Sequence, residues 1–261
     1  MAAPSLLLQN EPMIERVVDG LFAFCDMLGT TSDGAHTIDR DGVRAAVVPA
    51  APERALVNSV VYRDPEALES VYDELADAYR AIDAGWTVWV WPGHEASARL
   101  LEDRGHVLDA QPAAMIRDLE GLERPAAGAL ADWTADGDYA VVGPLNDRAY
   151  GLDTDSFTRA LTRRPGESTY VYVVHDGDDA VACLLVTDHD GNSDVECVAV
   201  LPEARGRGIS RYLLQHALVD AAERGNETST LVSTALGYPV YERLGYRPVG
   251  RLAMWERAAA P

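Results

Sequence analysis

Strand-like and helix-like patterns of apolar and polar residues alternate along the C-terminal half of the chain. Short runs rich in β-branched and aromatic residues predict strands, and apolar residues spaced three or four apart predict helices. One short helix has Pro239 in its first turn and Gly245 just past its end. In chain order the predicted elements are helices over 139–151 and 153–164, strands over 169–177, 179–191 and 193–202, a helix within 205–225, a strand over 228–234, a helix over 238–245 and a strand over 247–257.

This order of elements predicts the fold class. Helices, a three-strand meander, a helix, a strand, a helix and a last strand are typical of an α/β (α+β) protein. We therefore expect a mixed central β-sheet that is flanked by helices.

The N-terminal half repeats part of the same order. Aligning Gly105 with Gly245 matches LEDRGHV with YERLGYR and places Met115 near Met254. A repeated order of strand, helix, strand, helix and strand predicts a duplication, and hence two lobes. The repeated segments are a strand over 55–65, a helix over 66–85, a strand over 86–93, and a helix with a last strand within 96–119.

A segment over 119–133 that is rich in proline, glycine and alanine predicts the linker between the halves. We therefore expect an N-terminal domain over 1–124 and a C-terminal domain over 125–261. The N-terminal copy has YRDPEALES where the C-terminal copy has a glycine-arginine loop, and Leu101 takes the place of Tyr241. If the halves are related, the first has lost whatever this loop does.

The loop, within LPEARGRGISRYLL, concentrates positive charge in an acidic chain. The chain has 42 Asp and Glu against 22 Lys and Arg, a formal net charge of −20, yet Arg205, Arg207 and Arg211 stand beside two glycines where the predicted helix begins. Unpaired amides at a helix N-terminus and the helix dipole favour an anion. Glycine also lets a ligand approach the backbone. We predict a phosphate site here, with a plain basic turn as the alternative.

Two common nucleotide-binding motifs do not fit this loop. A Walker loop needs Gly-Lys-Ser/Thr at the start of the helix, and the chain has no such tripeptide. A dinucleotide fingerprint needs a third glycine where Arg211 stands.

The stretch VAVLPEARGRGISRYLL resembles the acyl-CoA-binding signature of the GNAT superfamily of N-acetyltransferases, Gln/Arg-x-x-Gly-x-Gly/Ala. Arg205 takes the first position and Gly208 the fourth, whereas Ser210 departs from the pattern at the sixth. YERLGYRP near the C-terminus is similar to the closing helix and strand of the family. The resemblance covers roughly residues 130–257 and implies a GNAT fold, with a degenerate GNAT-like N-terminal half.

The resemblance implies transfer of an acetyl group from acetyl-CoA to a primary amine of a small molecule or peptide, without a metal. The loop would hold the pyrophosphate. The strand before the loop would splay from its neighbour, so that the amides of Val198 and Val200 reach the pantetheine arm and polarise the thioester. The implied cofactor-binding residues are Val198, Ala199, Val200, Arg205, Gly206, Arg207, Gly208, Ile209 and Ser210.

Two side chains are candidates for proton transfer. Tyr241 stands at the position of the usual general acid of the family. A phenol with a pKa of about 10 can protonate a CoA thiolate. The alternative is a tyrosine that only packs in the core. Glu196 and Asp194 share one face of a predicted strand. Glu196 could take a proton from the ammonium directly or through water. A surface carboxylate, an ammonium anchor and a reaction without a dedicated base remain alternatives.

Composition narrows the class of protein. The chain of 261 residues is 48% hydrophobic and 25% charged, as in soluble globular proteins, and no apolar run approaches the roughly 18 residues that cross a membrane. The acidic balance disfavours nucleic acid as a partner. The N-terminus lacks the basic region of a signal peptide, and the three widely spaced cysteines are typical of a reduced cytoplasmic protein.

A second class of function also stays open. A non-catalytic acyl-CoA-binding sensor or regulatory module would share the loop but would need neither Tyr241 nor Glu196. Because the first copy has Leu101 at the equivalent position, the presence of Tyr241 favours the enzyme. The expected partner is a small-molecule or peptide amine, and the chain could act as a monomer or a homodimer.

Overall fold

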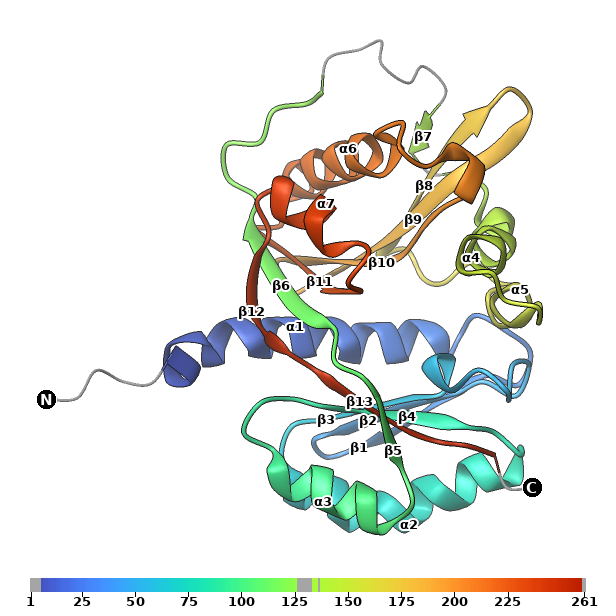
Figure 1. The fold of residues 1–261 in the computed structure, drawn as a ribbon, viewed down its shortest axis with the longest axis vertical. Coiled ribbons are helices and arrows are strands. Elements are labelled where there is room, and N and C mark those ends of the chain that lie inside the picture. The colour runs from blue at the N-terminus through green and yellow to red at the C-terminus, as the bar shows by residue number, and fades with distance from the viewer. Residues whose placement is uncertain (1–5, 126–132, 136, 260–261) are drawn as a thin grey trace, which may run out of the picture.

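The computed structural model describes residues 6–125, 133–135 and 137–259, and it contains two β-sheets. A long helix, α1 (Leu6–Leu28), lies between the sheets and contacts strands of both (Figure 1). Each sheet with its helices forms one lobe. The predicted α/β class and the two-lobed arrangement are therefore confirmed.

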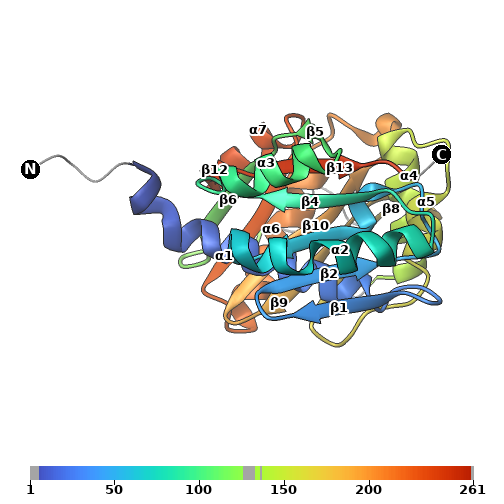
Figure 2. The ribbon, with the colours of Figure 1, turned by 90° about the horizontal axis from the view of Figure 1, so that it is seen from below.

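The N-terminal lobe is a six-stranded mixed sheet. Its elements are β1 (His36–Arg40), β2 (Val43–Val47), the 3-10 helix η1 (Ala55–Val57), β3 (Ser59–Tyr62), α2 (Pro65–Ala81), β4 (Trp86–Val90), α3 (Glu95–Asp103), β5 (Val107–Ala110) and, from the end of the chain, β13 (Ala253–Arg257). The strand order is β1-β2-β3-β4-β13-β5, with β3 and β4 parallel. Helices α2 and α3 cover the face that is turned away from α1 (Figures 1 and 2).

The C-terminal lobe is a seven-stranded mixed sheet. Its elements are β6 (Ala113–Asp118), β7 (Trp133–Ala135), η2 (Tyr139–Val141), α4 (Val142–Tyr150), α5 (Ser156–Ala160), β8 (Thr169–Asp176), β9 (Asp179–His189), β10 (Asn192–Val200), η3 (Pro202–Ala204), α6 (Ile209–Glu223), β11 (Thr228–Ser233), α7 (Tyr238–Arg243) and β12 (Arg247–Arg251). The strand order is β12-β6-β11-β10-β9-β8-β7, with β10 and β11 parallel.

Each sheet contains one strand from the other half of the chain. Strand β6 precedes the linker but lies between β11 and β12, whereas β13, the last strand of the chain, lies between β4 and β5. Met115 of β6 pairs with Leu231, and Met254 of β13 pairs with Trp89. From the three-strand meander onward, β1–β3 in one half and β8–β10 in the other, both halves have the same order of elements apart from this exchange. The part from β3 and from β10 follows the order that the sequence repeat predicts. The predicted division at residue 124 thus separates two halves that both contribute to each sheet.

The prediction of one final strand in each half is wrong, because the chain crosses between the sheets there. Strand β5 ends at Ala110 and β6 begins at Ala113, with Gln111 and Pro112 between them. Proline lacks the amide that a sheet ladder requires, so the chain leaves the first sheet at this point. The second crossing, at the buried Leu252 between β12 and β13, meets the first: the Leu252 amide donates to the Pro112 carbonyl at 3.1 Å.

Helix α1 supplies much of the core between the sheets. Its apolar residues recur at helical spacing on buried faces, which is why the helix packs between two sheets. The buried side chains of α1 include Ile14, Val17, Leu21, Cys25 and Leu28. A separate core joins α2 to the outer face of the N-terminal sheet through Leu68, Tyr72, Leu75 and Tyr79.

Other predicted elements differ in extent. The helix predicted over 153–164 covers only Ser156–Ala160, and α1, β1 and β2 lie in a segment without a predicted element. Residues 126–132 of the predicted linker lie outside the described residues. Within the part of the chain that the structure describes, no helix is long and apolar enough to cross a membrane.

Candidate active site

Strand β10 carries a bulge that separates it from β11. Its antiparallel pairing with β9 shifts register between Glu196 and Ala199, and Cys197 has a positive φ of 49°. Its parallel pairing with β11 ends at Val195 and Leu231. Because a bulge bends the strand that carries it, the two strands diverge beyond this pair. This is the splay that the family resemblance implies.

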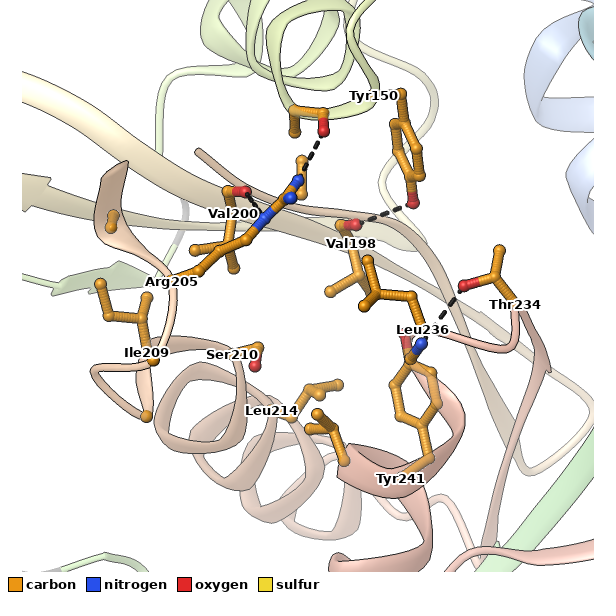
Figure 3. A pocket seen from close by; sticks show the side chains of 17 residues that line it. Tyr150, Val198, Val200, Arg205, Ile209, Ser210, Leu214, Thr234, Leu236 and Tyr241 are labelled. Atoms are coloured by element: carbon orange, nitrogen blue, oxygen red, sulfur yellow. Dashed lines mark hydrogen bonds between the residues drawn. The ribbon is translucent and has the colours of Figure 1, made fainter. Parts of the chain in front are cut away.

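The diverging end of β10 turns main-chain groups toward the open edge. The carbonyl of Val198 accepts a hydrogen bond from the Tyr150 hydroxyl, and that of Val200 accepts one from Arg205 Nε, each at 3.1 Å (Figure 3). Neither donor belongs to β9. Since the N–H and C=O groups of one strand residue point to the same side, the amides of Val198 and Val200 also face away from β9.

A cavity of about 280 Å³ lies against this edge of β10 (Figure 3). It is bounded by the loop after η3, the start of α6, the end of α4 and the segment that leads into α7. The predicted cofactor-binding residues that line it are Val198, Ala199, Val200, Arg205, Gly206, Gly208, Ile209 and Ser210. Arg207 is not among the residues that line this cavity.

The two glycines of the loop serve its shape and leave space beside it. Gly206 and Gly208 have φ values of 76° and 78°, where other residues are strained. A Cβ atom at either position would meet no atom within 4 Å. Gly208 is the N-cap of α6 and has no side chain to bond the first amides, so these amides remain for an anion.

The arginines of the loop have protein partners. Arg205 donates to the carbonyls of Val200 and, at 2.6 Å, Ala149, and so ties the end of α4 to β10. Arg207 forms an ion pair of 2.6 Å with Asp176 at the end of β8. The donors that the loop leaves available to a ligand are therefore mainly main-chain amides.

Tyr241 of α7 lines the same cavity. Its side chain is 9% exposed and belongs to the core cluster, with its ring 5.9 Å from that of Tyr246. Gly237 packs against the ring so closely that a Cβ there would lie 2.8 Å from Cε2. Burial raises the pKa of Tyr241 well above its usual value, so the hydroxyl keeps its proton at neutral pH. The residue thus has features of both interpretations, core packing and a site position.

A second cavity, of about 740 Å³, lies between the two lobes on the other side of the bulge. Helix α1, the segment around η1, β4 and β13 line it together with β10 and β11 of the C-terminal sheet. Tyr150 and Thr234 line both cavities. The two cavities therefore adjoin at these residues, beside the bulge.

Two buried carboxyl groups line the second cavity. Asp194 Oδ1 accepts a hydrogen bond of 2.6 Å from Thr230, and Gly20 of α1 leaves room for this carboxyl group, because a Cβ there would lie 2.5 Å from Oδ1. Glu196 is 8% exposed, and its polar neighbours Asp194 and Thr187 do not meet hydrogen-bond geometry.

Burial controls the protonation of this pair. It raises the pKa of Asp194 to about 7, although the Thr230 hydrogen bond opposes the shift. Burial also raises the pKa of Glu196 well above its usual value, and the charge of Asp194 adds to that rise. The pair therefore binds a proton more readily than two exposed carboxyl groups would.

The segment that carries these features matches the model of a known protein family. Residues 167–248 match the family model described as the acetyltransferase (GNAT) domain. This segment is a GNAT domain. It runs from just before β8 into β12 and so contains β10, the glycine-arginine loop and α7. No curated protein matches the chain.

Solved structures share the GNAT fold over most of the chain. A GCN5-related N-acetyltransferase from Kribbella flavida is 17% identical, with a TM-score of 0.65 over 92% of this chain and 96% of that one. Another from Sphaerobacter thermophilus is 20% identical, with a TM-score of 0.55 over 88% and 84%. A tandem GNAT protein from the clavulanic acid biosynthesis pathway is 17% identical, with a TM-score of 0.56 over 95% and 96%. At these identities the likeness shows the fold, which is the two-lobed GNAT fold that the sequence resemblance implies.

The N-terminal lobe lacks the uncapped amides that the C-terminal lobe has at the start of α6. Helix α2, the counterpart of α6, is capped by Asp64, whose carboxylate accepts a 2.8 Å hydrogen bond from the Ala67 amide. Pro65 removes a further amide from this helix end. A carboxylate thus lies where a phosphate would need free donors. Leu101, at the position of Tyr241, is fully buried.

Sequence patterns do not single out Tyr150 and Thr234, although both lie at the junction of the two cavities. Tyr150 ends α4 just before Gly151, far from the loop in sequence, and only the fold brings it to Val198. Thr234 accepts a hydrogen bond of 3.3 Å from the Gly237 amide at the start of α7. Among the described residues, no group of three or more His, Cys, Asp or Glu side chains could hold a metal ion.

Proposed function

We propose that this protein is an N-acetyltransferase that transfers an acetyl group from acetyl-CoA to a primary amine of a small molecule or peptide. The observation that carries the proposal is the junction of two cavities at the bulge of β10, with Tyr150 and Thr234 lining both. One cavity has donors for an anion, and the other has buried carboxyl groups for an amine. Transfer between two bound molecules needs them side by side.

The first cavity fits the donor that a GNAT domain implies. Free space beside Gly206 and Gly208 and the uncapped amides at the start of α6 would hold the pyrophosphate. The amides of Val198 and Val200 would hold the pantetheine arm and polarise the thioester carbonyl. Bound acetyl-CoA supplies the activated acetyl group.

Two residues of this chain would transfer protons during the reaction, one as a donor and one as an acceptor. Tyr241, which lines the first cavity and is protonated at neutral pH, would donate a proton to the departing thiolate. Glu196 would accept a proton from the substrate ammonium. A bound ammonium favours the ionised carboxylate, and so offsets the rise in pKa that burial causes at Glu196.

We assign the N-terminal domain, residues 1–124, a role in the acceptor cavity of the catalytic domain, residues 125–261. Helix α1, η1 and β4 contribute part of the cavity wall. Because Asp64 caps α2, this domain would not bind a second CoA. The cytoplasmic location and the monomeric or homodimeric state stay predictions.

The test combines calorimetric titration of acetyl-CoA with an assay of CoA release over a panel of primary amines. We expect binding, and release with at least one amine. Replacing Tyr241 by Phe should lower turnover about 100-fold and change the acetyl-CoA affinity by less than about twofold, because only the proton donor is lost. Tyr212→Phe removes a hydroxyl on α6 away from the cavity and should leave turnover unchanged.

The outcomes separate the alternatives. Full turnover of Tyr241→Phe would assign Tyr241 to the core alone. Tight binding without release from any amine would favour the acyl-CoA sensor. Absence of acetyl-CoA binding would refute the interpretation of the loop.

A further inference from the structure

Charged groups from both lobes line the second cavity. The C-terminal lobe contributes Asp194 and Glu196, and the N-terminal lobe contributes the guanidinium of Arg54. The wall between them is largely apolar and aromatic. It includes Leu21, Phe24, Trp89, Phe157 and Met254.

Among the described residues, no carboxylate lies at ion-pair distance from Arg54 in this cavity, although its positive charge opposes the rise in the pKa of Glu256. The Arg54 amide donates to the Ala51 carbonyl at 3.1 Å, and its Cζ lies 5.2 Å from the centroid of the Phe157 ring. Its buried Nε atom has no hydrogen-bond partner, and the residues that the structure describes give it no salt bridge. The neighbouring Glu53 is instead paired with Arg159. An unpaired cation at an apolar wall is stabilised by a ligand that brings the opposite charge.

We infer that the acetyl acceptor carries a carboxylate in addition to its amine, on an apolar body, and that Arg54 binds this carboxylate. This inference rests on the proposed function and narrows its substrate to the class of apolar amino acids and short apolar peptides. A guanidinium binds a carboxylate through two parallel hydrogen bonds, and stacking on Phe157 restrains its orientation. The amine would then lie toward Glu196 and Asp194, beside the bulge of β10.

A carboxylate suits this cavity better than a phosphate. A phosphate group carries up to two charges and three acceptor oxygens, which call for more than one free cation. The other arginine of the cavity, Arg251, already donates to the Gln111 carbonyl at 2.7 Å. Asp109 also lines the cavity and would repel a dianion. One free guanidinium matches the single charge of a carboxylate.

The experiment compares amines that differ only in the carboxylate: L-phenylalanine with phenethylamine, and 6-aminohexanoate with hexylamine. Affinities are measured by calorimetry in the presence of CoA, and rates by CoA release from acetyl-CoA. We expect the native protein to bind at least one of the acids about tenfold more tightly than its partner without a carboxylate, as for a charge-assisted pair. Arg54→Met retains a long apolar side chain and should abolish this preference, with the affinity for the amine without a carboxylate changed by less than about twofold.

Two controls accompany this variant. Arg163→Gln removes a positive charge from an exposed ion pair with Asp33 and should retain the preference. Unchanged acetyl-CoA affinity of Arg54→Met establishes that the variant is folded. The inference is overturned if neither acid is preferred, or if Arg54→Met weakens both members of a pair equally.

The proposed function and this inference can fail separately. Preferential binding of an acid without CoA release would refute the transferase and leave the carboxylate site standing. Turnover of the amines that lack a carboxylate, with exclusion of both acids, would support the transferase and refute the carboxylate site.

Discussion

Glu196 and Asp194 are two acids that the fold buries side by side. Each projects from β10 into the cavity between the lobes, and only Asp194 has a hydrogen-bond donor of its own, Thr230. Burying a carboxyl group without a partner is unfavourable unless the group becomes neutral or a ligand supplies the missing charge. The pair is therefore suited to an amine, which can supply both a positive charge and hydrogen-bond donors.

This environment predicts how the rate depends on pH. A general base must be deprotonated, and the pKa of Glu196 is raised, so kcat/KM should increase with pH over a range that lies above the usual titration range of a glutamate. Glu196→Gln should lower turnover about 100-fold and remove the part of this increase that belongs to Glu196. The measurement is a pH profile of kcat/KM with one amine, so that the ionisation of the amine is common to every variant.

Asp194→Asn is the matched control for this profile. The charge of Asp194 raises the pKa of Glu196, so its removal should shift the increase in rate to lower pH and retain it. If Glu196→Gln keeps the native profile and rate, the amine reacts without a dedicated base at this position.

Among the helices, α6 and α2 differ in what their free first-turn amides meet. Each helix follows the last strand of a three-strand meander, β3 before α2 and β10 before α6, and the first turn of a helix leaves amides without a partner in the helix. In α2 the Asp64 side chain and Pro65 satisfy or remove these donors. In α6 the N-cap is Gly208, in a left-handed conformation, and the donors face a cavity.

The conformation of Gly208 leads to a prediction. Gly208→Ala must hold φ near 78° and should lower the free energy of unfolding by about 1–2 kcal/mol. Because relaxation of the strained loop would move the first amides of α6, the acetyl-CoA affinity should fall about tenfold as well. Thermal unfolding and calorimetric titration measure the two effects.

Gly225→Ala serves as the comparison. Gly225 follows the other end of α6 with a φ of 97°, and a Cβ there would also meet no atom within 4 Å. We expect a similar loss of stability with unchanged acetyl-CoA affinity. Equal loss of affinity in both variants would mean that Gly208 acts through global stability only.

The two halves also indicate what sequence patterns can and cannot predict. The loop and the Tyr241 motif are local, so their residues and spacing can be identified from the sequence alone. The repeated order of elements can also be predicted, from the periodicity of apolar residues. The exchange of β6 and β13 between the sheets cannot be predicted from the sequence, because alternation of apolar residues predicts a strand but not the sheet that it joins. Pro112 is the only local signal of the first crossing. Arg54, Tyr150 and Thr234 become site residues only through contacts between distant segments.

In the molecule as a whole, the exchanged strands link the two lobes, because each sheet contains one strand from the other half of the chain. Strand β6 supplies pairing to both β11 and β12, and β13 supplies pairing to both β4 and β5. Helix α1 packs against both sheets. Unfolding of either half of the chain therefore withdraws an inner strand from the sheet of the other half, and the cavity between the lobes exists only when both are folded.

We accordingly expect one cooperative unfolding transition for the intact chain, with equal calorimetric and van't Hoff enthalpies. The test places a cavity-forming substitution in each core: Leu75→Ala on α2 and Leu213→Ala on α6, both fully buried in separate clusters. Each should lower the free energy of unfolding by about 2–5 kcal/mol. Each should also accelerate amide hydrogen exchange in the opposite sheet, because the sheets open together. If calorimetry instead resolves two transitions, and Leu75→Ala shifts only one of them while exchange in β11 is unchanged, the lobes are independent and the exchanged strands do not couple them.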